Sequence, residues 1–591
     1  MKRVKMNFRA VATALLAGTL LTGCASGVDQ IAGVQPPAPL SASAVSAFAV
    51  HAVAPADRGM VSAADPRAAA AGVQMLRAGG NATDAAIAVL LALNVVEPQS
   101  SGIGGGGFLV LEDEGRLTTY DGRETAPRAA NGDWFMQDGE PMAFADARTG
   151  GHAVGVPGNV AMMALAHKAH GDLPWSDLFQ PATALARDGF LMTDRLHKAL
   201  SGSSSVAAQS AQAQAVYYSA DGTPLPAGTM IRNPAFAAFL AQLAQDGPDA
   251  FYNGANAAAI SDAVRLAERN PAPLTLADLS EYEAVERPPV CGTYRLYRIC
   301  GMGPPSSGAT TVLATLKQLE AFDLAALGPH NPAAWHLIAG SMQLAFADRD
   351  AYVGDPAFVE VATAGLVDPA YLASRGALLL PDAALASIAP GQPPGTRFIA
   401  PQGLHAAEAG TSHLVVADGD GAVASLTTTV ESAFGSGLFV NGYFLNNELT
   451  DFSFVPAFNG VSVANAVAAG KRPRSSMAPT IVYGPDGAFR LAIGAAGGPT
   501  IIAQTAKTII AVVDWSLPLD EAIALPVLFA PGSAVLLEAE TPLARMSPVL
   551  EAMGHDVRPI PSIFKANGVE RVGDILRGAA DPRSEGAALA E

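Results

Sequence analysis

Two stretches with β-type patterning near residue 411 predict neighbouring strands. The first covers residues 411–417 and the second, which alternates apolar and polar positions, covers residues 423–430. Between them stands Asp-Gly-Asp-Gly (418–421), a strong turn signal. The pattern predicts a β-hairpin whose first strand opens on Thr411, directly after Gly410.

Helical patterning dominates before this hairpin. Asp65-Pro66 marks a helix start, and the segment 81–84 caps a nearly all-apolar helix at residues 85–96, which must be buried. Strand blocks between helical blocks predict an α+β fold with two packed sheets between helices, an αββα sandwich. The remaining blocks are mostly helical at 160–375, strand-rich from 411 to about 495, and helical at 500–515 and 540–553.

A glycine-rich run, Ser-Gly-Ile-Gly-Gly-Gly-Gly-Phe-Leu-Val-Leu (101–111), invites comparison with a phosphate-binding loop. Its glycines lead into a strand, however, and no Gly-Lys-Ser/Thr follows, so nothing in the run would cradle a phosphate. We therefore expect these glycines to allow the close approach of backbones.

The composition limits the possible classes of protein. Of 591 residues, 50% are apolar and 15% are charged, which indicates a globular chain with a large core. The net charge of -18 argues against nucleic acid, whose phosphates would repel it. The ten histidines are scattered without ligand spacing, so we expect no metal and no other cofactor.

The first 23 residues have the features of an export signal. Four basic residues within the first nine precede an apolar run at 10–21 that is too short to span a bilayer. The run ends in Leu-Thr-Gly-Cys24, which resembles a bacterial lipobox, so we expect lipidation of Cys24 and a periplasmic protein anchored to the membrane. Ser26, the third residue of the mature chain, resembles the residue found there in lipoproteins that are sorted to the outer membrane. Residues 24–54 would be a lipidated flexible tether. An ordinary secretory signal with an incidental Cys24 is the alternative.

Two further cysteines, Cys291 and Cys300, flank a predicted hairpin. In an exported protein they suit a disulfide, and two buried thiols are the alternative. Two cysteines cannot build a structural zinc site.

The threonine that opens the predicted hairpin has the chemistry of a self-activated nucleophile. Gly410 offers an unhindered peptide bond, and attack of the Thr411 hydroxyl on its carbonyl would release a new N-terminus. The α-amine of Thr411, with a pKa of roughly 7.7–8.0, would then act as the base. Gly-Thr-Ser-His alone is an ordinary strand start, so the hypothesis depends on the surrounding sequence.

Ordered motifs from about residue 55 to residue 584 resemble those of the γ-glutamyltransferases, a family of N-terminal nucleophile hydrolases. The resemblance implies an autocatalytic cut between Gly410 and Thr411, which gives a large subunit (55–410) and a small catalytic subunit (411–591) that stay together. The motifs are Gly-Gly-Asn-Ala-Thr-Asp-Ala (79–85), Gly-Gly-Gly-Gly-Phe (104–108), Arg-Glu (123–124), Ala-Val-Glu-Arg (284–287), Pro-Pro-Ser-Ser-Gly (304–308), Ala-Asp-Arg (347–349), Thr-Ser-His (411–413), Leu-Asn-Asn (445–447), Asp-Phe (451–452), Lys-Arg-Pro-Arg-Ser-Ser (471–476) and Gly-Ala-Ala-Gly-Gly (494–498).

The resemblance also assigns a reaction. Thr411 would attack a γ-glutamyl amide such as glutathione, and the acyl-enzyme would pass its acyl group to water, an amino acid or a peptide. The N–H groups of Gly497 and Gly498 would hold the oxyanion, and Thr429 would position the nucleophile's hydroxyl.

For the glutamyl head group, the resemblance implies a site of charged and hydroxyl side chains. Arg123 would bind the α-carboxylate with two parallel donors, which Lys would not reproduce. Asp451 and Glu448 would accept from the α-ammonium, and Ser475 and Ser476 would add donors. The alternatives are a surface pair for Arg123 and Asp451, a turn cap for the serines and solvated charges for the glutamates.

Two departures from the family pattern concern the substrate. Glu431 stands where typical members carry Asn; it would either strengthen the hold on an α-ammonium or compete for Arg123, and we expect Arg474 to offset its charge. Residues 452–469, at the position of the lid, contain no Tyr and look short, which would open the pocket and favour hydrolysis. Two other functions stay open: an amidase for another acyl group, such as a glutaryl or cephalosporin-type side chain, and an uncleaved lipoprotein that only binds ligands.

Overall fold

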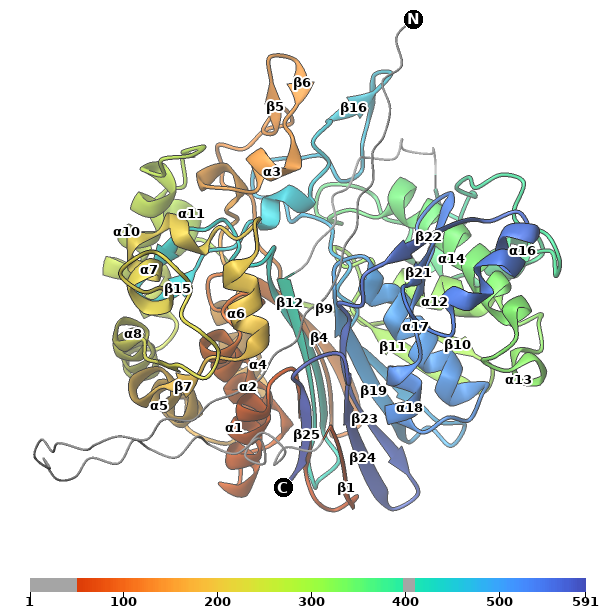
Figure 1. The fold of residues 1–591 in the computed structure, drawn as a ribbon, viewed down its shortest axis with the longest axis horizontal. Helices are drawn as coiled ribbons and strands as arrows, with labels where there is room; N and C mark the ends of the chain where they lie inside the picture. The colour runs from red at the N-terminus through yellow and green to blue at the C-terminus, as the bar shows by residue number, and fades with distance from the viewer. Residues whose placement is uncertain (1–49, 397–409) are drawn as a thin grey trace, which may run out of the picture. The chain divides into compact units, whose positions relative to one another are not determined.

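Two seven-stranded antiparallel sheets, stacked face to face, form the centre of the protein (Figure 1). The computed structural model describes residues 50–396 and 410–591. In spatial order, the first sheet contains β1 (His51–Pro55), β24 (Ile575–Ala580), β23 (Lys565–Val572), β19 (Phe489–Ala496), β18 (Thr480–Tyr483), β11 (Tyr297–Gly301) and β10 (Val290–Tyr294). The second sheet contains β25 (Ala587–Ala590), β2 (Met60–Ala63), β12 (Gly410–Ala417), β13 (Val423–Glu431), β3 (Gly106–Asp113), β4 (Arg116–Gly122) and β9 (Val285–Arg287).

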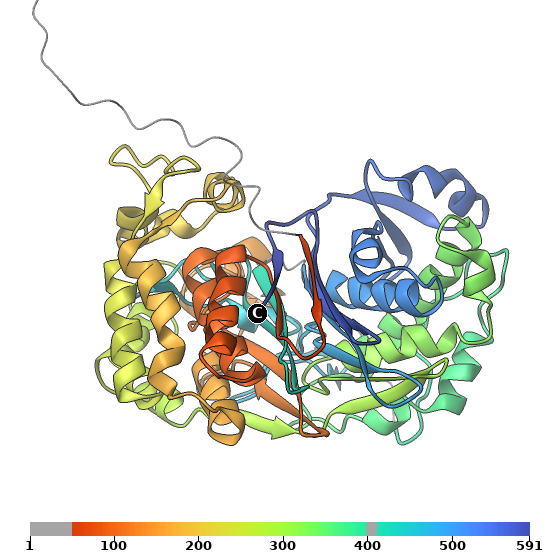
Figure 2. The same cartoon turned by 90° about the horizontal axis from the view of Figure 1, so that it is seen from below.

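Helices cover the outer face of each sheet, so the layers run helix, sheet, sheet, helix (Figures 1 and 2). The predicted αββα sandwich is confirmed. Beside the second sheet lie α1 (Pro66–Arg77), α2 (Ala82–Val96), α4 (Asn159–His170), α5 (Gln180–Asp188), α8 (Pro234–Asp246) and α10 (Gly254–Arg265). Beside the first sheet lie α12 (Gly308–Gln318), α14 (Pro332–Tyr352), α16 (Pro369–Gly376), α17 (Thr500–Val513) and α18 (Leu519–Ala524).

Shorter elements connect these layers. The short helices are α3 (Phe144–Ala147), α6 (Asp194–Ser201), α7 (Ala211–Tyr217), α9 (Asp249–Tyr252), α11 (Leu276–Ser280), α13 (Leu324–Leu327), α15 (Thr363–Leu366) and α19 (Ser547–Ala552). The short strands are β5 (Met136–Gln137), β6 (Glu140–Pro141), β7 (Phe190–Leu191), β8 (Met230–Ile231), β14 (Phe439–Val440), β15 (Tyr443–Phe444), β16 (Ala457–Phe458), β17 (Val461–Ser462), β20 (Leu528–Phe529), β21 (Ala534–Glu538) and β22 (Asp556–Ile560).

Helix α2 shows how the sequence specifies its own boundaries. The Asn81 side chain accepts hydrogen bonds from the N–H groups of Thr83 and Asp84, and the Asp84 carboxylate accepts from the N–H of Asn81. Every residue of the helix is buried, as its apolar sequence predicts. The helix predicted at 540–553 is shorter than expected, because Pro548 lies in the first turn of α19 and favours a helix start there.

The hairpin predicted around residue 411 is the β12–β13 pair at the centre of the second sheet. Its register sets Leu414 opposite Leu426, and both strands are buried along their whole length. The two sheets pack tightly here, because a Cβ atom on Gly494 of β19 would lie 2.4 Å from Cε1 of His413. Only glycine fits at residue 494.

The glycine-rich run serves close backbone packing, as expected from its sequence. A Cβ atom on Gly105 would lie 1.9 Å from the carbonyl oxygen of Thr429, and one on Gly104 would lie 2.1 Å from that of Phe444. Gly106 is paired with Thr429, so the run lets β3 lie directly against the end of β13.

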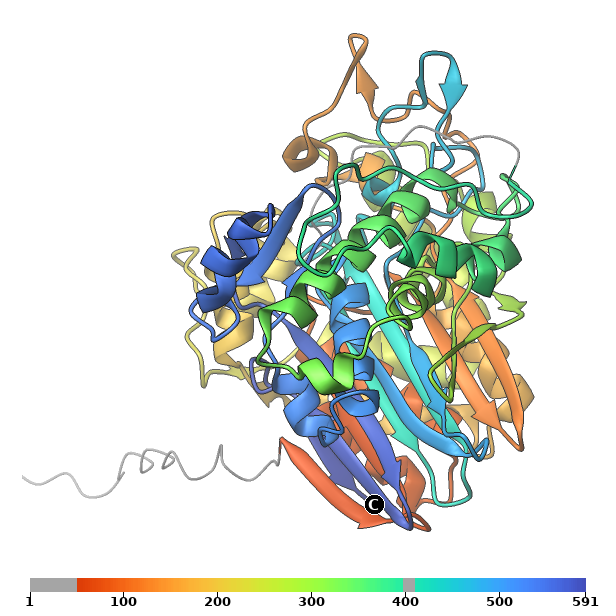
Figure 3. The same ribbon diagram turned by 90° about the vertical axis from the view of Figure 1, so that its right-hand side faces the viewer.

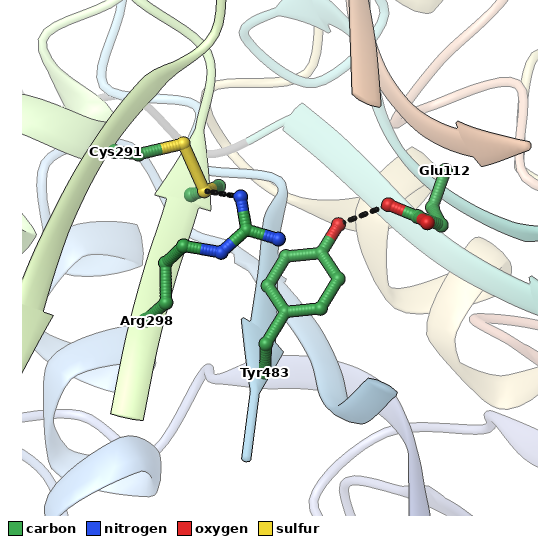
Figure 4. The surroundings of a disulfide bond; sticks show 5 residues. Glu112, Cys291, Arg298 and Tyr483 are labelled. Carbon is green, nitrogen blue, oxygen red and sulfur yellow. Dashed lines mark hydrogen bonds between the residues drawn. A yellow bond between two sulfur atoms is a disulfide. The ribbon is translucent and has the colours of Figure 1, made fainter. Parts of the chain in front are cut away.

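A disulfide joins Cys291 and Cys300, which are opposite each other on β10 and β11 (Figure 4). Arg298 lies beside it, with a guanidinium nitrogen 3.8 Å from the Cys300 sulfur and Cζ 3.9 Å from the centre of the Tyr483 ring. The Tyr483 hydroxyl donates to Glu112 of β3 and thereby links the two sheets (Figure 4). Of the two alternatives for these cysteines, the disulfide is the one found.

The predicted tether needs a correction at its C-terminal end. Residues 51–54 belong to β1, in which His51 is paired with Ala579 of β24, because backbone hydrogen bonds to the sheet order these residues. Cys24, the predicted signal and the rest of the tether lie outside the described residues. Within residues 50–396 and 410–591, no helix is long and apolar enough to cross a membrane.

Candidate active site

Three residues around the start of β12 are connected by hydrogen bonds. The Thr429 hydroxyl on β13 donates to the carbonyl oxygen of Gly410 at 2.5 Å. The same hydroxyl oxygen accepts from the N–H of Glu431 at 2.8 Å and lies 3.1 Å from the Thr411 hydroxyl. Because the Thr429 proton already points to Gly410, the Thr411 hydroxyl is the donor to Thr429. The structure thus brings the predicted nucleophile to the predicted positioning residue and cleavage site.

An irregularity of the strand pairing creates this arrangement. Gly410 is paired with Glu431 while Thr411 is paired with Thr429, so Val430 is an extra residue on β13. Glu431 has a φ of +76°, a region that favours glycine and costs a buried glutamate some strain. The bulge is what lets one side chain, that of Thr429, meet both residues of the predicted cut.

Gly497 and Gly498 form the turn between β19 and α17. Both have positive φ values, +115° and +58°, which other residues adopt poorly. The turn lies at the Thr411 end of the sheets, since Ala496 pairs with Lys565, whose ammonium is 3.2 Å from the Ser412 hydroxyl. The oxyanion role expected for the N–H groups of these two glycines stays a prediction.

Arg123 joins the two acidic residues predicted to bind a head group. Its guanidinium donates to the carboxylates of Glu448 and Asp451, and also to the carbonyl oxygens of residues 473 and 474 at 3.0 Å. The side chains of Arg123 and Asp451 are 1% and 7% exposed, which excludes a surface pair. Arg123 precedes the predicted cut and both acids follow it, so the cluster needs both parts of the chain.

Three buried glutamates lie in this cluster: Glu124 and Glu448 beside Arg123, and Glu431, which interacts with Glu448 and Asp451. Burial next to Asp451 and Glu448 raises the pKa of Glu431 well above its ordinary value. Burial also raises the pKa of Glu448, although Arg123 opposes the shift, and raises the pKa of Glu124 to about 8. One oxygen of Glu431, one of Glu448 and both of Glu124 lack a hydrogen-bond partner among the described residues. Solvated charges are thus excluded, and the site has acceptors for a cationic or donor-bearing group.

Comparison with known proteins identifies the family. A family model described as "Gamma-glutamyltranspeptidase" matches residues 68–591. The chain belongs to the gamma-glutamyltranspeptidase family. It is 35% identical, over 601 residues, to the "Glutathione hydrolase proenzyme" of Escherichia coli (strain K12), across 98% of this chain and 97% of that protein.

Acylases are also similar to this chain. The "Acylase ACY 1 proenzyme" of Pseudomonas sp. (strain V22) is 34% identical over 547 residues, which cover 90% of this chain and 93% of that protein. The crystal structure of a cephalosporin acylase from Bacillus halodurans has a TM-score of 0.78 and 25% identity, across 95% of this chain and 99% of that chain.

The two predicted serines are buried beside the carbonyl groups that Arg123 contacts. Ser475 Oγ accepts from the N–H of Met477 at 3.1 Å, which is the geometry of a turn cap. Ser476 Oγ accepts from Arg349 at 2.7 Å. Both hydroxyl groups thus already have protein partners, and a substrate would share them.

Arg474 has a different partner from the one expected. Its guanidinium forms an ion pair with Asp350 of α14 at 2.9 Å. Among the described cations, Arg148 is one on which the charge of Glu431 acts: burial lowers the pKa of Arg148, and Glu431 raises it. The expected compensation of Glu431 by Arg474 is therefore replaced by an Arg474–Asp350 pair.

The segment at the lid position forms a small hairpin. Strands β16 and β17 project at the same end of the molecule as β5 and β6 (Figures 1 and 3). Phe454 at its base stacks on Phe135, with 4.4 Å between the ring centres. With the chain continuous through Gly410, Thr411 is only 2% exposed. The more open pocket expected from residues 452–469 concerns the mature, cut protein and stays a prediction.

Two charged residues near the nucleophile were not predicted as site residues from the sequence. Lys565, at the start of β23, lies 2.8 Å from Glu97, at the end of α2, and both contact Ser412. The one available signal was the position of Glu97 directly after an all-apolar helix. A carboxylate there must be buried or mark a helix end, and the sequence does not say which.

Proposed function

We propose that this chain is a γ-glutamyltransferase and glutathione hydrolase that matures by cutting itself before Thr411. The observation that carries the proposal is the hydrogen-bonded connection from Thr411 through Thr429 to the Gly410 carbonyl. The 35% identity to a glutathione hydrolase proenzyme, over nearly the full length of both chains, supports the activity and the maturation.

Maturation is an acyl shift from nitrogen to oxygen. Thr411 Oγ attacks the Gly410 carbonyl carbon; its proton passes to Thr429, which gives its own proton to the carbonyl oxygen. Collapse of this intermediate re-forms the carbonyl and breaks the C–N bond, and the nitrogen takes up the proton. Water then hydrolyses the resulting ester, which leaves a Gly410 carboxylate and a free α-amine on Thr411.

The two products of this cut remain in one fold. Strand β12 lies between β2 of the large subunit and β13 of its own, and β13 pairs in turn with β3 of the large subunit. Each sheet therefore contains strands from both subunits. Separating residues 55–410 from 411–591 would break these backbone ladders, so we expect a stable heterodimer.

Turnover uses the same hydroxyl with a new base. The freed α-amine of Thr411, with a pKa of roughly 7.7–8.0, takes the hydroxyl proton as Oγ attacks the γ-carbonyl carbon of the substrate. The N–H groups of Gly497 and Gly498 stabilise the oxyanion, and the amine leaves with the proton. Water, or the amine of an amino acid or peptide, then attacks the ester and releases the glutamyl group.

The buried cluster around Arg123 recognises the glutamyl head group. An α-carboxylate takes the place of internal carboxylates at the Arg123 guanidinium, where two parallel donors are available. The displaced Glu448 and Asp451 then accept from the α-ammonium, and the free oxygen of Glu431 adds a third acceptor. Ser475 and Ser476 supply hydroxyl groups next to the carboxylate.

A specific observation favours a second function, that of an amidase for another acyl group. Glu431 adds a carboxylate to the cluster, and both an acylase and a cephalosporin acylase are similar to this chain. Turnover of γ-glutamyl-p-nitroanilide and glutaryl-p-nitroanilide by the mature protein separates the two. We expect the first to be the better substrate and glutathione to compete with it. Faster release from the glutaryl compound would establish the amidase instead.

Export and lipid anchoring are part of the proposal. The lipobox-like Cys24 is the site of attachment, and the Cys291–Cys300 disulfide supports an oxidising compartment such as the periplasm. Growth with labelled palmitate tests the anchor. We expect label in the wild-type protein and none after Cys24→Ala; label that persists in the variant would refute the anchor at Cys24.

A further inference from the structure

We propose that the buried ion pair between Glu97 and Lys565 positions the nucleophile by acting through Ser412. Within the part of the chain that the structure describes, neither side chain has a hydrogen bond or ion pair with Thr411, so both are positioning residues. The inference rests on the proposed function, because it adds to the same Thr411 site.

Three polar side chains contact the Ser412 hydroxyl: Glu97, Lys565 and, at 3.4 Å, Ser101. Lys565 Nζ lies 2.8 Å from Glu97 Oε2 and 3.2 Å from Ser412 Oγ. The Ser412 hydroxyl in turn donates to Glu97 Oε2 at 2.8 Å. Because this hydroxyl accepts from the ammonium and donates to the carboxylate, its rotamer is fixed by two charges at once.

The ion pair is almost completely buried. The side chains of Lys565 and Glu97 are 0% and 2% exposed. Taking two charges out of water is costly, and well-packed apolar residues often stabilise a fold equally well or better. A gain in stability therefore does not explain why two charged residues are buried here. Their directional hydrogen bonds to Ser412 do.

The position of Lys565 in the first sheet links the nucleophile to the proposed oxyanion turn. Its side chain reaches Ser412, the residue after the nucleophile, and its backbone is paired with Ala496, the residue before Gly497. One lysine thus contacts the neighbours of both the nucleophile and the proposed oxyanion turn. Loss of its ammonium would free these two elements to shift relative to each other, and displacements of about 1 Å can cost roughly 100-fold in rate.

The test compares substitutions that remove the charge, keep it, or remove only the link to the nucleophile. Lys565→Met removes the ammonium, Lys565→Arg keeps the positive charge, and Ser412→Ala removes the link without leaving a charge unpaired. For each variant, the rate of the cut before Thr411 is followed on a denaturing gel. Turnover of γ-glutamyl-p-nitroanilide by the mature fraction then gives kcat and KM.

A second buried lysine provides the matched control. Lys507 of α17 is 3% exposed, and its ammonium donates to the carbonyl oxygens of residues 522, 523 and 525. Lys507→Met therefore removes a buried ammonium that contacts none of the proposed catalytic groups. It reports how much a general loss of stability alone changes the cut and the turnover.

We expect Lys565→Met and Ser412→Ala to slow the cut and lower kcat by about tenfold or more, with KM within about threefold of wild type. Lys565→Arg should restore at least part of kcat, and Lys507→Met should lower the melting temperature and leave kcat within about twofold. The inference is overturned if Lys565→Met and Ser412→Ala keep wild-type kcat, or if Lys507→Met lowers kcat equally. A wild-type protein that cuts itself but releases no nitroaniline would instead refute the proposed function, and the rates of the cut would still test the ion pair.

Discussion

The hydroxyl oxygen of Thr429 lies 3.1 Å from the hydroxyl oxygen of Thr411 and accepts its hydrogen bond. Thr429 passes its own proton toward the carbonyl of Gly410, the group that Thr411 would attack. One side chain therefore orients the nucleophile and polarises its first electrophile. This double role makes Thr429 the most informative residue for a test of the maturation step.

Replacing Thr429 by Val should slow the cut by roughly 100-fold, because Val has the same shape and lacks the hydroxyl that relays the proton. Thr429→Ser keeps the hydroxyl and is the control, with an expected rate within about tenfold of wild type. The fraction of cut chain over time on a denaturing gel measures both. Equal rates for the Val and Ser variants would show that the hydroxyl has no part in the reaction.

Arg123→Lys should raise KM for γ-glutamyl-p-nitroanilide by roughly 10–100-fold with kcat changed much less, because a lysine cannot offer two parallel donors to a carboxylate. Steady-state kinetics of the mature protein provide the measurement. Arg116→Lys is the control, since Arg116 is exposed and pairs with Glu286 away from this cluster. An unchanged KM in Arg123→Lys would mean that the α-carboxylate binds elsewhere.

Glu431→Gln should stabilise the protein at pH 7 and above. A carboxyl with a raised pKa in the folded state binds its proton more tightly there than in the unfolded state, so its contribution to stability falls as pH rises above the unfolded pKa. Gln reproduces the protonated form and removes this loss; we expect a gain of about 1–3 kcal/mol, typical of relieving an unpaired buried polar group. Urea unfolding of uncut Thr411→Ala chains with and without Glu431→Gln measures it. A less stable Glu431→Gln chain at pH 7 would indicate an ionised Glu431 that needs its charge.

The His336–His555 contact should make the protein lose stability in acid. His336 donates from Nε2 to the carbonyl oxygen of Leu380, so its Nδ1 accepts from Nε2 of His555 at 2.7 Å. Burial, and then His336, lower the pKa of His555 to about 4. Between the unfolded pKa of about 6.5 and the folded value, the unfolded chain binds the extra proton, so the free energy of unfolding falls as pH falls.

His555→Gln keeps a donor for His336 and does not titrate. Between pH 7 and pH 4, wild type should therefore lose about 1–2 kcal/mol more than this variant, which is less than the whole shift because solvent screens part of it. The comparison is made by urea unfolding in the Thr411→Ala background, so that a single chain unfolds. Identical pH dependence in both chains would contradict the assignment of the shift to His555.

The sequence predicts the parts of this protein that local patterns determine. Alternation and turn residues define the β12–β13 hairpin, and the cap at Asn81 defines the buried helix α2. The resemblance to a family pointed to Arg123 and Asp451, which the structure joins although they are 328 residues apart. That pairing followed from the resemblance to a family, since no local pattern links residues so distant.

Contacts set by tertiary packing could not be predicted. Lys565 and Glu97 are 468 residues apart and meet only because β23 and the end of α2 reach the same side of Ser412. Arg474 was expected to face Glu431 because the two charges would balance, but the position of α14 offers it Asp350. In both cases the position of a helix or strand in the fold determines the contact. The sequence next to each residue does not reveal that position.

The most direct test of the account is the intact mass of the small fragment, before and after a short reaction with γ-glutamyl-p-nitroanilide stopped by acid. The account predicts two fragments, the smaller beginning Thr-Ser-His-Leu, and an increase of its mass by one γ-glutamyl group that maps to Thr411. Thr411→Ala should give one uncut chain and no mass increase. A single full-length chain in the wild type, or a γ-glutamyl group on another residue, would contradict the central claim that Thr411 is both the site of the cut and the nucleophile.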